Sequence, residues 1–130
     1  MTVRRNQFVD QVQERLGLAS REEAERTVDA VLETLGERLE LTEKHHLASQ
    51  VAADLKEPIL RRKRTERYDL EEFFNRVGAR AGGLKYAHAQ NHTKVVLSLL
   101  RAAIAPGEWR HITMKLPEDY RSLLRGDSSD

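Results

Sequence analysis

Apolar residues recur along most of the chain at the spacing of α-helices. From Arg21 onward they follow one another three or four positions apart, which places them on one helical face. Ser20 and Glu23 form a capping-box pattern just before this stretch. We therefore predict a long helix from about Arg21 to Leu41, whose apolar face carries Ala24, Val28, Val31, Leu32, Leu35 and Leu39.

Shorter amphipathic segments flank this long helix. One precedes it and is predicted to end at Gly17, because glycine readily adopts the left-handed conformation that closes a helix. A third helix is expected to begin near Thr42 and a fourth near Ala52, where Pro58 should end or kink it. The apolar positions of the first short helix are Phe8, Val12 and Leu16.

The sequence matches itself without a gap when it is shifted by half its length, so that Phe8 is aligned with Phe73. Apolar positions and a glycine stay in phase across half of the chain in this alignment, and strand signals are nearly absent. We therefore predict a single all-α domain, residues 1–130, of about eight helices in two tandem four-helix repeats that share one core. The repeats span residues 1–61 and 66–126, and a basic linker, residues 61–67, joins them. Matching pairs include Phe8 with Phe73, Val12 with Val77, Gly17 with Gly82, Ala24 with Ala89, Leu35 with Leu100, and His46 with His111.

Three phrases of the second repeat resemble a bacterial family known only as domain of unknown function 2267. They are Phe73-Phe-Asn-Arg-Val77, Val95-Val-Leu-Ser-Leu-Leu100 and Leu116-Pro-Glu-Asp-Tyr-Arg-Ser-Leu-Leu124. The first repeat is similar to the same family, so the resemblance extends over residues 8–124. It implies a duplicated α-helical domain without an established activity and without catalytic residues to transfer. The first repeat has Val51-Ala52 where the second has Leu116-Pro117, which leaves the start of its fourth helix open.

Composition narrows the class of protein. The 130 residues are 39% hydrophobic and 33% charged, which is typical of a folded domain and not of a disordered chain. The chain contains no cysteine, which excludes disulfides, thiol catalysis and thiolate metal sites. No segment approaches the roughly 20 apolar residues that a membrane helix requires. We expect a cytoplasmic protein that does not associate with membranes.

The outer faces of the two long helices differ. The first predicted long helix presents an acidic ridge of six carboxylates roughly opposite its apolar face. The corresponding positions of the second are small or weakly polar, and its apolar face is wider, as expected for a buried helix. This small-residue face either packs against the first repeat or forms an interface with a protein partner or a second copy, with Ala87, Ser98 and Ala102 as candidate interface residues. The acidic ridge comprises Glu22, Glu25, Asp29, Glu33, Glu37 and Glu40.

Charge is distributed unevenly between the two halves. Residues 1–60 contain 8 basic and 12 acidic side chains, whereas residues 61–130 contain 14 and 9. The basic linker could bind a polyanion, because clustered arginines bind phosphate groups. It could equally form ion pairs with acidic helices, and neither a helix-turn-helix nor an aromatic stacking platform accompanies it. The candidate polyanion-binding residues are Arg61, Arg62, Lys63, Arg64 and Arg67.

Candidate chemistry is sparse. His88 and His92 are four residues apart on a predicted helix, which suits two metal ligands but does not complete a site. The sequence contains neither a His-Glu-x-x-His pattern nor a glycine-flanked nucleophilic serine. We therefore expect no enzyme activity, no cofactor and no bound metal. The sequence favours a non-catalytic helical interaction or scaffold module that is able to self-associate, with weak nucleic-acid or polyanion binding as the alternative.

Overall fold

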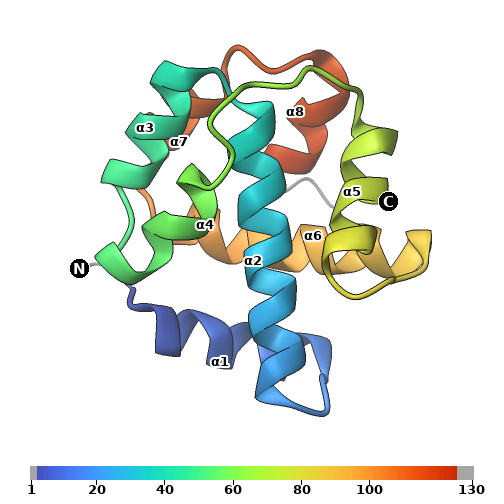
Figure 1. The fold of residues 1–130 in the computed structure, drawn as a ribbon. Helices are drawn as coiled ribbons and strands as arrows, with labels where there is room; N and C mark the ends of the chain where they lie inside the picture. Colours follow the sequence, from blue (N-terminus) through green and yellow to red (C-terminus); the bar gives the residue numbers. More distant parts are fainter. Residues whose placement is uncertain (1–2, 126–130) are drawn as a thin grey trace.

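The computed structural model describes residues 3–125 and confirms the all-α class. Within these residues it contains eight α-helices, one short 3₁₀ helix and no strand (Figure 1). None of the described helices is long and apolar enough to cross a membrane. The elements are α1 (Arg5–Leu16), α2 (Arg21–Arg38), α3 (Leu41–Ser49), the 3₁₀ helix η1 (Ala53–Leu55), α4 (Lys56–Leu60), α5 (Leu70–Arg80), α6 (Tyr86–Ala102), α7 (Pro106–Thr113) and α8 (Glu118–Leu124).

Local signals set the helix ends much as the sequence indicates. Gly17 has a φ of 62° and closes α1 in the left-handed conformation. The Ser20 hydroxyl accepts a hydrogen bond from the Glu23 amide, and the Glu23 carboxylate accepts one from the Ser20 amide, so both halves of the capping box form. Helix α2 ends at Arg38, slightly before the predicted end at Leu41.

The sequence predicts that Pro58 ends or kinks the fourth helix, and the structure shows that it does not end it. The segment begins as a 3₁₀ turn at Ala53 and continues as the five-residue helix α4, with Pro58 as its third residue. Proline is tolerated there because the first turn of a helix lacks intrahelical partners for its amide groups.

Helix starts in the second half coincide with those of the first when the two repeats are aligned through Phe8 and Phe73. In this alignment the first residues of α5, α6 and α7 fall on the first residues of α1, α2 and α3. The first residue of α8 falls on that of η1. This agreement is what a duplicated unit requires. Superposition of the two halves as one repeated unit stays a prediction.

Helix α2 is the central element, and every residue from Ala30 to Leu39 is buried. Helices α1, α4, α5 and α6 all contact it, and Figure 1 shows α4 and α5 on either side of it. Helix α6 is less completely buried than its wide apolar face indicates. Helix α6 exposes Ala87, Lys94 and Ala102, so its small-residue face does not pack against the first half.

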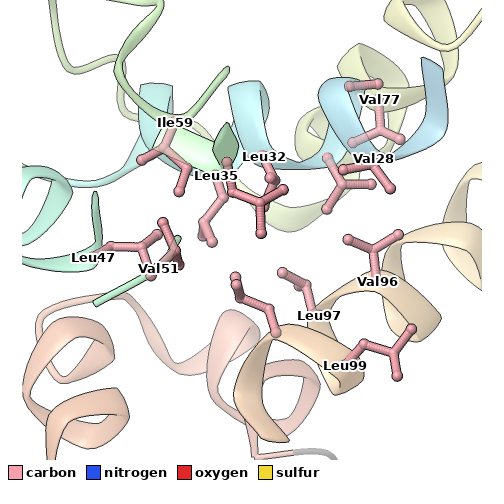
Figure 2. Packing of buried hydrophobic residues seen from close by; sticks show 14 of the residues in the cluster. Val28, Leu32, Leu35, Leu47, Val51, Ile59, Val77, Val96, Leu97 and Leu99 are labelled. Carbon is pink, nitrogen blue, oxygen red and sulfur yellow. The ribbon is translucent and has the colours of Figure 1, made fainter. Parts of the chain in front are cut away.

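The core lies where α2 crosses α6. Val28, Leu32 and Leu35 of α2 approach Val96 and Leu97 of α6, and all five are at most 2% exposed (Figure 2). Burying each aliphatic side chain contributes about 1.5–3 kcal/mol. Helices α3 and α4 close the same core with Leu47 and Ile59.

Gly36 lets the backbone of α4 lie directly against α2. A Cβ atom added at Gly36 would lie 2.0 Å from the carbonyl oxygen of Ile59. Backbone cannot yield as a flexible side chain does, so no larger residue fits without separating the two helices. This close approach fixes where the segment after α4 leaves the core.

We expect Gly36→Ala to lower the free energy of unfolding by at least about 1–3 kcal/mol, because the added methyl group overpacks the α2–α4 contact. The matched control is Gly107→Ala in α7, where an added Cβ meets no atom within 4 Å. The control should be neutral or stabilising by about 0.4–1 kcal/mol, since alanine favours the helix. Urea denaturation measures both changes, and equal stabilities for the two variants would contradict the close approach.

Candidate functional site

The acidic ridge is not a solvated surface at its C-terminal end. Glu33 is 5% exposed and Glu37 is 2% exposed, because α5 and the chain that follows α4 cover them. Asp29, nearer the start of the ridge, pairs with Arg5 at 2.9 Å. Most carboxylates of the ridge therefore serve contacts inside the protein, which the amphipathic pattern alone did not reveal.

Glu37 is the centre of a buried charge cluster. Arg80 of α5 donates two parallel hydrogen bonds to its carboxylate, at 3.0 and 3.1 Å, and the Tyr68 hydroxyl donates a third at 2.7 Å. Arg76 lies 3.1 Å away and also stacks over the Tyr68 ring at 4.1 Å. Burial alone would raise the pKa of Glu37, but the hydrogen bonds from Arg80 and Tyr68 and the charge of Arg80 lower it to about 2.

The basic linker supplies the remaining partners of the ridge. Arg61 and Arg62 donate hydrogen bonds to Glu33 at 3.0 and 2.6 Å, and Arg67 donates one to Glu40 at 2.8 Å. Three of the five candidate polyanion-binding residues are thus engaged within the protein. The other two, Lys63 and Arg64, are exposed and form no ion pair with any residue in the range 3–125.

The backbone around this linker is bonded to α2 and α3 as well. Lys44 is 1% exposed, and its ammonium group donates a hydrogen bond to the Arg62 carbonyl at 2.6 Å. Burial lowers the pKa of Lys44. The Thr65 hydroxyl donates to the Leu39 carbonyl at 2.8 Å, and the Glu66 amide donates to the Glu37 carbonyl at 2.9 Å. The linker therefore belongs to the packed structure.

The second half lacks this covering and instead forms a groove between the end of α6, α7 and α8. The groove has a volume of about 920 Å³. Its wall is closed by a hydrogen bond of 2.9 Å from the Trp109 indole to the Leu124 carbonyl. The lining residues are Arg101, Ala102, Ile104, Pro106, Trp109, Arg110, Thr113, Met114, Arg121, Leu124 and Arg125.

Two differences between the aligned repeats account for the groove. Arg101 occupies the position of Gly36, so α8 cannot approach α6 as closely as α4 approaches α2. Ala102 occupies the position of Glu37, so the residue that binds Arg80 and Tyr68 in the first half has no counterpart. The sequence analysis did not predict the groove, although these two differences between the repeats can be read directly from the sequence.

The candidate interface residues on α6 lie on the accessible side of the molecule. Ala87 and Ala102 are exposed, and Ser98 is half-buried. Ala102 also lines the groove, so the small-residue face and the groove are continuous. Helix α6 therefore offers one open surface that runs into a groove at its C-terminal end.

The histidines do not assemble a metal centre. The His88 and His92 rings stack with centroids 6.4 Å apart, and burial together with the neighbouring His88 lowers the pKa of His92. His46 contacts the Glu108 carboxylate at 2.5 Å and the His111 ring at a centroid distance of 5.1 Å. Within residues 3–125, no three His, Asp or Glu side chains are grouped so that they could bind a metal ion.

We expect Glu37→Gln to lower the free energy of unfolding at pH 7 by up to about 3–5 kcal/mol, because it removes the bidentate partner of Arg80 and one of the partners of Arg76. The pKa of Glu37 is about 2 when folded and has an ordinary value of 4.5. Its ionisation therefore adds roughly 3 kcal/mol above pH 4.5, which is lost as the pH falls toward 2. Urea denaturation between pH 2 and 7 should show a flatter acid dependence in the variant.

The matched control is Glu40→Gln, which removes an exposed ion pair with Arg67 from the same helix end. It should change stability by about 0–1 kcal/mol at pH 7. Identical pH profiles for Glu37→Gln and the unmodified protein would show that the buried cluster does not control acid stability.

One family model, described as "Uncharacterized conserved protein (DUF2267)", matches residues 5–123. No relative among curated proteins matches the chain. The match extends from the start of α1 into α8, so it includes the buried charge cluster and most of the groove lining. The chain therefore belongs to the DUF2267 family.

Proposed function

We propose that the protein is a non-catalytic helical interaction module whose second half provides the contact surface. The difference between the two long helices carries this proposal. The outer face of α2 is occupied by the linker and α5, whereas the corresponding face of α6 is open and continues into a groove. Because this face is covered on α2 but open on α6, we expect a partner to bind at the open face of α6.

The lining of the groove supports binding over catalysis. Its ionisable groups are four arginines, and a guanidinium stays protonated at neutral pH, so it cannot exchange protons as a general acid or base. Apolar side chains form much of the remaining surface. Arginine and tryptophan are the residue types most enriched where proteins bind one another.

Self-association through the small-residue face of α6 is one form of this function. Short side chains such as those of Ala87 and Ala102 allow another helix to approach closely. We expect the protein to dimerise at high concentration and Ala102→Arg to remain a folded monomer, because the change adds bulk and charge at an exposed site.

Sedimentation over a range of concentrations measures this equilibrium. The matched control is Ala79→Arg, an exposed alanine on α5 and not on the small-residue face of α6, which should dimerise as the unmodified protein does. A monomeric wild type at all concentrations would end the self-association proposal. An unfolded Ala102→Arg variant would show that Ala102 is required inside the fold.

Weak polyanion binding is the alternative function, and the exposure of Lys63 and Arg64 favours it. Two phosphate contacts give an expected slope of about −1.8 for log K against log salt on duplex DNA. Replacing both residues with Gln should abolish binding without changing stability. Arg61→Gln should instead lower stability by up to about 1 kcal/mol, because it removes a partner of Glu33.

A fluorescence titration with labelled duplex DNA and with heparin at low salt measures this binding. Binding that survives the Lys63 and Arg64 double change would exclude these two residues as the site. If neither DNA nor heparin binds, polyanion binding is excluded as the alternative to the interaction module.

A further inference from the structure

We propose that the groove between α6, α7 and α8 binds an extended acidic peptide segment with apolar side chains, supplied by another protein molecule. The inference rests on the proposed interaction function and specifies the partner's chemistry. Three observations carry it: what occupies the corresponding place in the first half, the charge around the groove, and the apolar surface inside it.

The first half shows that a chain segment without helical structure occupies the place corresponding to this groove. The last carbonyl groups of a helix have no partners inside the helix. At the end of α2, the Glu37 carbonyl accepts a hydrogen bond from the Glu66 amide of the linker. Just beyond α2, the Leu39 carbonyl accepts one from the Thr65 hydroxyl. Lys44 of α3 donates to the linker backbone as well.

The same three positions line the groove in the second half. When the repeats are aligned through Phe8 and Phe73, the counterparts of Glu37, Leu39 and Lys44 all belong to the groove lining. In the first half these positions bind the linker, two of them through its backbone and Leu39 through the Thr65 hydroxyl, and in the second half they face the 920 Å³ groove. The geometry of the first half therefore indicates what kind of chain fits the second. The aligned pairs are Glu37 with Ala102, Leu39 with Ile104, and Lys44 with Trp109.

The charge of the groove is opposite to that of its first-half counterpart. In the first half the helix surface is acidic and the bound linker is basic. In the second half Arg101, Arg110 and Arg121 lie around the groove, and the first two form no ion pair within residues 3–125. Guanidinium groups bind carboxylates through paired hydrogen bonds, so a complementary segment carries Asp or Glu.

Apolar side chains inside the groove add a second requirement. Ile104, Trp109 and Leu124 form its floor and are each at most 5% exposed, whereas Met114 beside them is 55% exposed, which is unusual for so large an apolar residue. A volume of about 920 Å³ is within the roughly 300–1,000 Å³ typical of sites that enclose a ligand. Apolar side chains of the segment would cover Met114 and the exposed Ala102 and Pro106, while its carboxylates pair with the arginines.

Selection from a displayed library of random short peptides against the full chain tests the inference. We expect the enriched peptides to combine Asp or Glu with apolar residues. Trp109 is the single tryptophan of the chain and lines the groove, so its emission reports binding of a synthetic copy of an enriched peptide.

Charge reversal in the groove is the decisive variant. Arg101→Glu and Arg110→Glu should each weaken binding about tenfold or more, since each replaces a hydrogen bond between opposite charges with repulsion between carboxylates. Both residues are exposed, so neither change disturbs the core. The matched control is Lys94→Glu, an equal charge change on an exposed part of α6 outside the groove, which should alter affinity less than about twofold.

The outcomes separate this inference from the proposed function. Acidic peptides that bind Arg101→Glu and Lys94→Glu equally well would place binding elsewhere, which overturns the groove while the interaction module stands. No enrichment by the wild type or by a variant with Asp127→Asn and Asp130→Asn overturns the groove, and the module then depends on the dimerisation measurement. Enrichment only after Asp127→Asn and Asp130→Asn would identify the chain's own C-terminal residues as the occupant and overturn a partner molecule.

Discussion

The buried carboxylate of Glu37 is the constraint on which the arrangement of the two halves depends. An isolated ionised group at that depth would cost several kcal/mol, so the fold must bring cations and hydrogen-bond donors to it. Arg80 and Arg76 come from α5, and Tyr68 comes from the chain just before it. Satisfying one charge on α2 therefore docks the first helix of the second half against the centre of the first.

The same requirement explains why two halves of similar pattern are not equivalent in space. The C-terminal half of α2, from Ala30 onward, can be buried on all sides because its polar face finds partners within the protein, whereas α6 has Ala102 at the position of Glu37 and needs no such cover. Gly36 then admits the backbone of α4, while Arg101 keeps α8 away from α6. Asymmetry of the surface thus follows from a few substitutions on a common helical pattern.

The sequence alone predicts where the helices lie, but it does not predict which other segments cover their outer faces. Helical periodicity and the Ser20 capping box place α2 within a few residues, because both signals are local. Periodicity identifies the face that meets the core but not whether another segment covers the opposite face. The burial of Glu33 and Glu37 depends on α5 and the linker, which are distant in sequence, so it required the three-dimensional structure.

The fold explains how the unequal charges of the two halves are placed. The first half contains 12 acidic side chains, and several of them are neutralised by arginines from the linker and α5. Those contacts use basic groups on the inner side of the second half. Lys94, Arg101 and Arg110 remain on its outer side, where they are exposed. Exposed positive charge therefore lies on the open surface of α6 and α7 as well as at Lys63 and Arg64 of the linker, and this placement, more than the net charge of +1, sets the electrostatic field at these surfaces.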